Sequence, residues 1–209
     1  SAAMHVVLFQ PEIPPNTGNI IRICANTGDS LHLIRPLGFE WDDKRLRRAG
    51  LDYHDFTSVS LHDSLDHCER KLADHRWFAM TTKGSRNFAE IEFDADDVLL
   101  YGPETRGLPD DVLDRWPADR KLRIPMQAPT RSINLANSVA ITRAFSRANN
   151  RALCAAHAAA FVPPDAGSNS ASDGAAQLAA VRRTHAAPDK CANARTISAA
   201  DIHSERRPD

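Results

Sequence analysis

The chain has 209 residues, a formal net charge of −1 at pH 7 and a pI of about 6.7. Apolar residues make up 42% and charged residues 25%, which is typical of one soluble globular domain with or without a tail. The near-neutral charge excludes attraction of nucleic acid by the molecule as a whole, so a nucleic-acid partner would need a local basic patch.

The cysteines are far apart and show neither a CxxC pair nor metal-ligand spacing. They are Cys24, Cys68, Cys154 and Cys191. This pattern favours a reducing cytoplasm and argues against a disulfide scaffold or a zinc site. No apolar run approaches the roughly 18 residues that cross a bilayer, and no signal peptide is evident. We therefore expect a cytoplasmic protein with no membrane segment and no metal, in which residues 1–3 are the remnant of an expression tag.

Residues 97–109, which read DVLLYGPETRGLP, combine an apolar run with an abrupt turn. Val98–Tyr101 is long enough for a strand that is buried on both faces. Gly102 permits close backbone approach, and Pro103 fixes the turn without offering an N–H donor. We interpret residues 104–106 as one wall of an active site, because ligands of open α/β sheets bind at the carboxyl ends of strands. The alternative is an ordinary turn between a strand and a helix.

The N-terminal part predicts a strand, a stiff loop and a helix. Residues 5–10 are rich in β-forming side chains and predict the first strand. Residues 11–18 hold three prolines and a glycine, and they predict an extended loop that cannot be helical. The helix is expected to begin near Gly18 or Asn19 and to end at Gly28. One face of this helix is polar and carries Asn19, Arg22 and Asn26. We interpret this face as an edge that contacts substrate, and the alternative is a face in contact with solvent.

A basic cluster lies downstream of the second predicted strand. A short helix is expected from Asp42, with Asp42 and Asp43 favourable to the helix dipole at its start. Four cations fall within five residues: Lys44, Arg45, Arg47 and Arg48. They predict contacts with RNA phosphates, and the alternative is a solvated face paired with the two aspartates.

The rest of the chain alternates strands with helices. Further strands are predicted at residues 31–34, 56–59, 77–82, 98–101 and 121–124. Helices are predicted at residues 63–73, 110–116 and from Ser132 to about Ala148. The alternation predicts an α/β fold with a mostly parallel sheet flanked by helices on both faces. Three histidines without a partner pattern are expected at the surface: His62, His67 and His75.

Three predicted strands end in loops rich in glycine or proline, after Thr82, Tyr101 and Ile124. Because parallel strands end at the same edge of a sheet, these loops are expected to converge into a pocket. Ser132 is expected to cap the following helix through its hydroxyl. Asn134 and Asn137 are too polar for the start of a core helix and indicate a ligand contact.

The composition changes after Asn150. Residues 151–209 are rich in Ala, Ser, Asp and Arg and poor in large apolar groups, which predicts a mobile tail or loosely attached helices. The predicted division is a tag remnant at residues 1–3, one domain at residues 4–150 and an atypical tail at residues 151–209.

Three stretches, in this order, resemble the motifs of the SPOUT superfamily of RNA methyltransferases. They read NTGNIIR at 16–22, GPETRGL at 102–108, and IPM at 124–126 with SINLANS at 132–138. The flanking PEIPPNTGN at 11–19 and WDDKRLRRAGLDYH at 41–54 are similar to the bacterial tRNA 2′-O-methyltransferases that act on wobble nucleotide 34 of leucine tRNAs. The resemblance covers about residues 4–142.

The resemblance implies an α/β fold whose C-terminal part forms a deep trefoil knot. It also implies S-adenosylmethionine as the cofactor and a homodimer whose active site is built across the interface. Carried over by position, the cofactor contacts are Met80, Gly102, Ile124 and Ser132, with Thr81, Glu104 and Leu135 close by. The implied catalytic residues are Arg22, which would act on the hydroxyl, and Asn16 and Ser132, which would position the sugar and phosphate.

The implied reaction is 2′-O-methylation of the ribose of nucleotide 34, a cytidine or a modified uridine, in leucine tRNAs. The 2′-hydroxyl attacks the sulfonium methyl in line, so alignment supplies much of the acceleration. A guanidinium is a poor base, with a pKa above about 12. We therefore expect Arg22 to hold the phosphate and polarise the hydroxyl.

Two alternative functions accompany this interpretation. The last helix reads TRAFSRANN at 142–150, where the family usually has aromatic and acidic residues, so one alternative is a non-catalytic RNA-binding protein that retains the fold. The other is a nucleotide-binding α/β hydrolase. It is the weaker one, because the chain has no Walker sequence, no nucleophile elbow and no catalytic-triad order.

Overall fold

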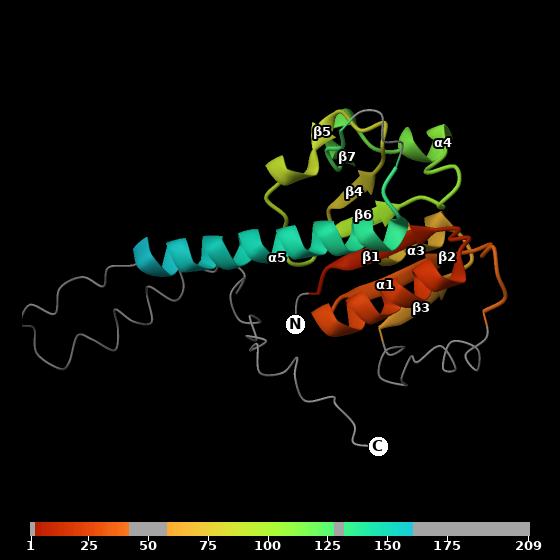
Figure 1. Ribbon diagram of the computed structural model, residues 1–209, viewed down its shortest axis with the longest axis horizontal. Coiled ribbons are helices and arrows are strands. Elements are labelled where there is room, and N and C mark those ends of the chain that lie inside the picture. Colours follow the sequence, from red (N-terminus) through yellow and green to blue (C-terminus); the bar gives the residue numbers. More distant parts are fainter. Residues whose placement is uncertain (1–2, 42–57, 128–131, 161–209) are drawn as a thin grey trace, which may run out of the picture. The chain divides into compact units, whose positions relative to one another are not determined.

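The structure, a computed structural model, describes residues 3–41, 58–127 and 132–160. Contacts divide the chain into two units, Ala2–Asn150 and Ser1 with Arg151–Asp209, and the fold is that of the first unit. The described strands form one seven-stranded sheet in the order β3-β2-β1-β6-β4-β7-β5, in which every pair is parallel (Figure 1). The predicted α/β class is confirmed. In the described part of the chain, no helix has the length and apolar character to span a membrane.

The direction in which strands are added to the sheet reverses beside β1. The described strands are β1 (His5–Phe9), β2 (Ser30–Ile34), β3 (Val59–His62), β4 (Trp77–Met80), β5 (Arg86–Asn87), β6 (Val98–Tyr101) and β7 (Lys121–Arg123). The described helices are α1 (Pro14–Thr27), α3 (Leu65–Lys71), α4 (Asp110–Leu113) and α5 (Leu135–Ala160), with 3-10 turns η2 (Phe88–Glu90) and η3 (Ala118–Arg120). The chain runs outward from β1 to β3 and then builds the other half of the sheet. Such a reversal point is where open parallel sheets bind ligands.

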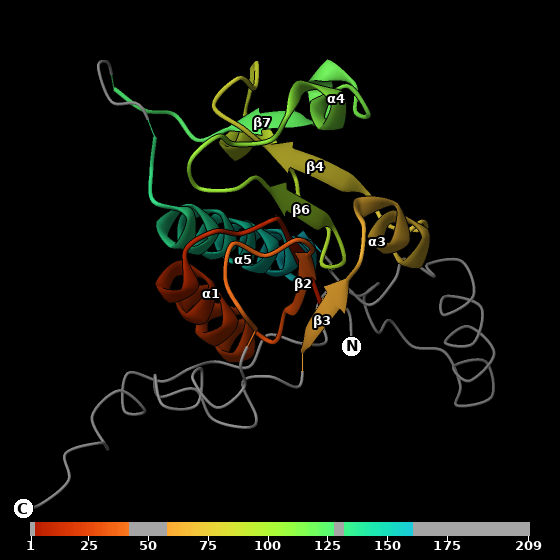
Figure 2. The same ribbon diagram turned by 90° about the vertical axis from the view of Figure 1, so that its right-hand side faces the viewer.

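The central strand β6 separates two apolar layers. Its four residues are all buried, as the continuous apolar run predicts. Val98 and Leu100 pack with α3 and α4, whereas Leu99 and Tyr101 pack with α1 and α5. Figure 2 shows these two helix pairs on opposite faces of the sheet. The alternation follows from the two-residue period of a strand.

Helix α1 begins earlier than predicted. Pro14 and Pro15 occupy its first two positions, where an N–H would have no partner within the helix and where the φ fixed by the ring suits the helix. The carbonyl of Ile13 accepts hydrogen bonds from the N–H groups of Asn16 (3.1 Å) and Thr17 (3.2 Å). The prediction that residues 11–18 cannot be helical was therefore wrong. The predicted end at Gly28 is confirmed, with φ at +73°.

Helix α5 begins after Ser132 and extends beyond the predicted end near Ala148. Asn134, not Ser132, caps it: Asn134 Oδ1 accepts hydrogen bonds from the N–H groups of Ala136 (2.9 Å) and Asn137 (3.2 Å). The prediction that Ser132 caps the helix was wrong, because Asn134 directly precedes the first helical residue. The continuation to Ala160 follows from the alanine-rich sequence, since alanine has the highest helix propensity.

The predicted third strand is present as β3 at Val59–His62, and it extends beyond the predicted end at residue 59; residues 56 and 57 lie outside the described part. Its register pairs Ile34 of β2 with His62, which is 1% exposed. The prediction that His62 lies at the surface was therefore wrong, and His67 and His75 are half-buried. Pairing with β2 sets both the position of β3 and the burial of His62, and a short stretch of sequence predicts neither.

A buried ion pair joins α5 to the sheet. Arg143 Nε and Nη2 donate to the two carboxylate oxygens of Asp29 at 2.6 Å each, and Arg143 Nη1 donates to Ser146 Oγ at 2.6 Å. One residue earlier, the hydroxyl of Thr142 lies 2.5 Å from that of Tyr101 at the end of β6. The polar stretch at 142–150, where the sequence departs from the resemblance, therefore supplies specific contacts to the core.

We expect Arg143→Met to lower the free energy of unfolding by about 3–5 kcal/mol, because it leaves the Asp29 carboxylate buried without its partner. Denaturant unfolding measures the loss. The matched control is Arg115→Met, which removes a cation paired with Asp66 and Glu69 at a more exposed position. It should cost no more than about 1 kcal/mol. Equal losses in the two variants would contradict the assignment.

Candidate active site

A cavity of about 500 Å³ opens at the carboxyl ends of β4, β6 and β7. Residues from 80–83, 101–108 and 124–138 line it, together with Ile13 and Asn16 beside the start of α1. The loops after the three strands therefore share one cavity, as the sequence predicts. Its volume falls within the range of small-molecule sites in proteins, about 300–1,000 Å³.

The loop after β6 turns so tightly that its first residue has no room for a side chain. A Cβ on Gly102 would lie 2.3 Å from the backbone nitrogen of Leu108 and 2.4 Å from the carbonyl carbon of Gly107. The Gly107 N–H closes the turn onto the carbonyl oxygen of Pro103 at 2.9 Å. The absence of a side chain at Gly102 keeps the backbone exposed to the cavity.

Two glutamates fasten this loop to the segment before α1, and we call the paired contacts the glutamate clamp. Glu104 accepts hydrogen bonds from the N–H groups of Glu12 (2.8 Å) and Ile13 (3.3 Å). In return, Glu12 accepts hydrogen bonds from the N–H (3.1 Å) and the hydroxyl (2.6 Å) of Thr105. The two loops are thereby fixed to each other at neighbouring points, although they are far apart in sequence.

The hydrogen bond from the Thr105 hydroxyl lowers the pKa of Glu12 below its ordinary value of 4.5. A carboxylate with a lowered pKa stabilises the fold above its unfolded-state pKa, and it loses that contribution as the pH falls through the folded value. The clamp is therefore intact at neutral pH and weakens in acid below about pH 4.5. Because Glu12 is largely in contact with solvent, the contribution is small.

A chain of amides continues from the clamp to α5. Asn16 Nδ2 donates to Glu104 Oε1 at 3.2 Å, and Asn134 Nδ2 donates to Asn16 Oδ1 at 2.9 Å. Asn134 also caps α5. The start of α1, the loop after β6 and the start of α5 are therefore held by one polar network at the cavity.

The Tyr101 hydroxyl is not a candidate acid or base at neutral pH. Burial raises the pKa of Tyr101 well above its ordinary value, and the hydroxyl is bonded to Thr142. Tyr101 lies at the wall of the cavity and joins β6 to α5.

All seven residues predicted to contact the cofactor line this cavity. They are Met80, Thr81, Gly102, Glu104, Ile124, Ser132 and Leu135. Of the predicted catalytic residues, Asn16 and Ser132 line it, whereas Arg22 lies on an exposed face of α1 and does not. The predicted RNA-binding cluster lies outside the described residues: Lys44, Arg45, Arg47 and Arg48.

Sequence reasoning missed Glu12 and Gln10. Gln10 adopts a left-handed backbone, with φ at +49°, and its side-chain oxygen accepts a hydrogen bond from Arg106 Nη2 at 2.5 Å. Strained residues of this kind concentrate at functional sites. For Glu12, the available signal was its position directly before the first turn of a helix, where a carboxylate is favoured.

Comparisons with known proteins agree with this geometry. Residues 3–144 match the SpoU rRNA Methylase family. A protein from Yersinia pestis named tRNA (cytidine(34)-2′-O)-methyltransferase is 57% identical over 143 residues, which cover 66% of this chain and 88% of the relative. The chain belongs to the SpoU methylase family.

Two solved structures extend the comparison. One, described as giving structural insights into 2′-OH methylation of C/U34 on tRNA, is 44% identical with a TM-score of 0.65, covering 71% of this chain and 96% of the other. The other, an AdoMet-bound rRNA methyltransferase from Sinorhizobium meliloti, is 26% identical with a TM-score of 0.59, covering 69% of this chain and 56% of the other. SpoU methylases use S-adenosylmethionine, so the cavity is tested first for that cofactor.

We expect Gly102→Ala to weaken S-adenosylmethionine binding at least about tenfold, because the new Cβ displaces the backbone that closes the cavity. Calorimetric titration measures the affinity. The matched control is Gly28→Ala at the end of α1, where a Cβ meets nothing within 4 Å and only the left-handed backbone is strained. That control should lose about 1–2 kcal/mol of stability and keep its affinity. Unchanged affinity in Gly102→Ala would exclude this loop from the cofactor site.

Proposed function

We propose that this SpoU methylase transfers a methyl group from S-adenosylmethionine to the ribose 2′-hydroxyl of cytidine 34 in tRNA. The observation that carries the proposal is the single cavity that joins three sequence-distant loops, with Met80, Gly102 and Ile124 in its walls. The Yersinia pestis relative, named for this reaction, supports the substrate. The resemblance of the motifs supports a finer substrate proposal, in which the tRNAs are leucine tRNAs and a modified uridine is a second wobble base.

The residues in the cavity suit the cofactor. Met80, Ile124 and Leu135 offer apolar surface for an adenine ring, and the exposed backbone beside Gly102 offers polar groups for its edge. When bound, S-adenosylmethionine supplies an electrophilic methyl group on a positively charged sulfur. The protein's contribution is then alignment, which can supply several kcal/mol of the barrier.

Asn16 acts in this proposal as a positioning residue. Both ends of its amide are engaged, with Glu104 on one side and Asn134 on the other. The amide therefore fixes the distance between the loop after β6 and the start of α5. Ser132 is exposed at the cavity and offers a hydroxyl to the incoming sugar or phosphate.

Arg22 would act on the site of a second copy of the chain. It follows Asn16 by six residues, which is about 9 Å along the helix and about 120° around its axis. The two side chains of one chain therefore do not face the same cavity. A homodimer with the active site across the interface, as the motifs imply, would bring Arg22 to the hydroxyl and phosphate.

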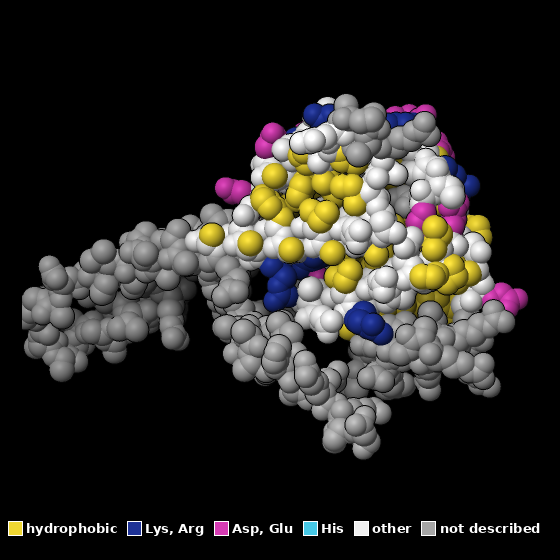
Figure 3. Space-filling view, in the orientation of Figure 1, with side chains coloured by type: hydrophobic (Ala, Val, Ile, Leu, Met, Phe, Trp, Pro, Cys, Tyr) yellow, Lys and Arg dark blue, Asp and Glu magenta, His cyan; other side chains and the backbone are white. Residues whose placement is uncertain are grey.

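An apolar surface supports the homodimer. Figure 3 shows apolar side chains gathered along α5 and beside it, and Ile141 of α5 is 40% exposed. Exposed apolar patches of this kind mark interaction sites. We propose the same helix face for the dimer contact.

Three further parts of the proposal rest on the sequence. Residues 4–150 are proposed as the methyltransferase domain and residues 151–209 as an appended tail. The deep trefoil knot is likewise proposed from the resemblance of the motifs. A tRNA substrate makes the cytoplasm the expected compartment.

The test is methylation of a leucine tRNA transcript, with mapping of the modified nucleotide. Incorporation of one methyl group at the ribose of nucleotide 34 is expected, and none when that 2′-hydroxyl is replaced by hydrogen. A chain that binds tRNA but neither S-adenosylmethionine nor its demethylated product would instead be a non-catalytic RNA-binding protein.

We expect Arg22→Ala to lower methyl transfer at least about 100-fold while cofactor binding stays intact, as for the loss of a group that acts on the reacting hydroxyl. Single-turnover rates with saturating cofactor measure the effect. Asn26→Ala, on the same exposed face of α1, is the matched control and should retain its rate. Undiminished turnover by Arg22→Ala refutes the assignment.

Replacing Lys44 and Arg45 by glutamine should weaken tRNA binding and flatten its salt dependence by about two units of slope, because two phosphate contacts are lost. Filter binding between low and moderate salt measures both quantities. The matched control replaces Arg115 and Lys71 by glutamine, two cations on the α3 side of the sheet, and should leave binding and slope unchanged. If affinity and slope are unchanged in the first variant, the cluster is a solvated face.

A further inference from the structure

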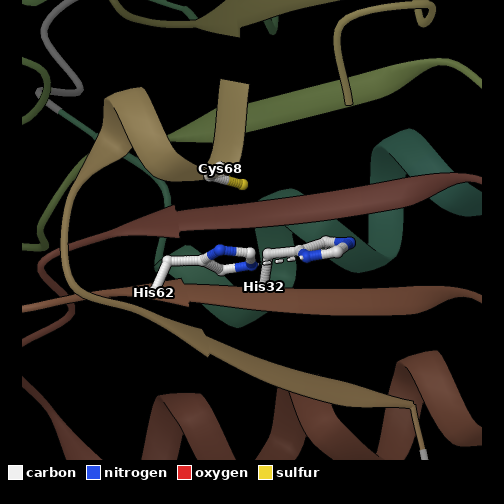
Figure 4. Close-up of side chains that lie close together, drawn as sticks. All are labelled: His32, His62 and Cys68. Atoms are coloured by element: carbon white, nitrogen blue, oxygen red, sulfur yellow. Dashed lines mark hydrogen bonds between the residues drawn. The ribbon is translucent and has the colours of Figure 1, made fainter. Parts of the chain in front are cut away.

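A second group of reactive side chains lies beneath α3, apart from the cavity. His32 on β2, His62 at the end of β3 and Cys68 on α3 each offer one ligand atom, and these atoms lie within 4.8 Å of one another (Figure 4). All three residues are buried, at 7%, 1% and 0% exposure. None of them lines the proposed methyl-transfer cavity. Because they come from three separate elements, spacing in the sequence could not reveal the group.

The two histidines belong to a hydrogen-bonded row that ends without a partner. His5 Nδ1 lies 3.0 Å from His32 Nε2, and His32 Nδ1 lies 3.0 Å from His62 Nε2. The remaining ring nitrogen, His62 Nδ1, is buried and has no hydrogen-bond partner in the described structure. An unsatisfied buried polar atom is unfavourable, so its retention requires a reason.

The row also provides outer support of the kind that metal-binding histidines have. Such histidines usually hydrogen-bond through the nitrogen that does not bind the metal. His32 Nε2 has this contact with His5, whose ring in turn lies 4.6 Å from that of His75. The hydrogen bond with His5 therefore fixes the orientation of the His32 ring on the side away from Cys68 and His62.

The protonation states suit a cation. Burial lowers the pKa of His32 to about 3 and also lowers the pKa of His62, so both rings are neutral and keep a lone pair. Burial raises the pKa of the Cys68 thiol to about 12, so its proton leaves only when a metal with high affinity for sulfur replaces it.

Charge selects the ion. One thiolate and two neutral imidazoles carry a charge of −1, so a monovalent cation leaves the buried site neutral. A divalent cation would leave an uncompensated positive charge near Lys71, whose field already lowers the pKa values of both histidines. The nearby Glu69 carboxylate, which raises the pKa of Cys68, is paired with Arg115 at 2.6 Å and offsets that charge only in part. Uncompensated buried charges cost several kcal/mol.

The number and types of the ligands fit the same ion. Thiolates bind soft ions such as Cu(I) and Zn²⁺, imidazole binds copper and zinc, and two histidines with one cysteine form trigonal copper sites. Metal–ligand bonds of about 2.0–2.3 Å in a trigonal arrangement separate the ligand atoms by about 3.5–4 Å. Side-chain rotations that move the ligand atoms by about 1 Å would close the group around the ion.

We propose that His32, His62 and Cys68 form a binding site for one Cu(I) ion. Binding forms one Cu–S and two Cu–N bonds, replaces the hydrogen bond between His32 Nδ1 and His62 Nε2, releases the Cys68 thiol proton to solvent and changes no oxidation state. The ion joins β2, β3 and α3. It therefore stabilises the folded state without entering the methyl-transfer cavity.

The test titrates the full chain, without oxygen, with Cu(I) supplied as its acetonitrile complex against the chelator bicinchoninate. All proteins carry Cys154→Ser and Cys191→Ser, so that Cys24 and Cys68 are the cysteines that remain. The parent should take one Cu(I) from the chelator and gain thiolate-to-copper absorption in the ultraviolet. The variants Cys68→Ser and His62→Gln should lose that equivalent.

The matched control is Cys24→Ser, which removes the other buried free thiol, whose pKa is likewise raised to about 12. It should bind copper as the parent does. A copper equivalent retained by Cys68→Ser, or Zn²⁺ bound as tightly as Cu(I), overturns the proposal.

A measurement on the parent keeps the proposal testable if either variant fails to fold. Cu(I) should shift the imidazole ¹⁵N resonances of His32 and His62. Absence of any shift at His32 and His62 at saturating Cu(I) would mean that the group is only a packed histidine row.

Discussion

The cavity depends on the glutamate clamp between two loops that the sheet alone does not position. Parallel strands fix where β1 and β6 end, but not how the chain leaves them. Glu104 accepts hydrogen bonds from the N–H groups of Glu12 and Ile13, and Glu12 accepts hydrogen bonds from the N–H and the hydroxyl of Thr105. Since Pro14 and Pro15 carry no N–H, the clamp satisfies the last free donors before α1. The same hydrogen bonds therefore fix both the start of α1 and the shape of the cavity.

A residue with two structural roles also begins α5. Asn134 caps the helix and also holds Asn16, so the helix start is tied to the cavity. Further along, Arg143 is tied to Asp29, which directly precedes β2. Two polar anchors, one at each end of the packed part of α5, set both its direction and its position along its axis. Apolar packing alone would permit sliding by a helical turn.

The sequence predicted those features that depend on local pattern. Val98–Tyr101 is an apolar run, and its burial on both faces follows directly. Gly102 signals a tight turn, and the turn leaves no room for a Cβ. The failures depend on long-range pairing instead. His62 is buried because β3 pairs with β2, and α1 starts at Pro14 because its orphan donors are absent or satisfied elsewhere. Local composition carries no information about either partner.

Helical geometry directs the two ends of the motif NTGNIIR to different faces of α1. Asn16 is buried at the cavity, whereas Arg22 is exposed on another face of the same helix. One rigid helix cannot direct both side chains into one cavity, because their spacing fixes the angle between them. In the proposed homodimer, Asn16 would shape the site of one copy and Arg22 would complete the site of the other. The proposed dimer therefore follows from the role proposed for Arg22 as well as from the apolar face of α5.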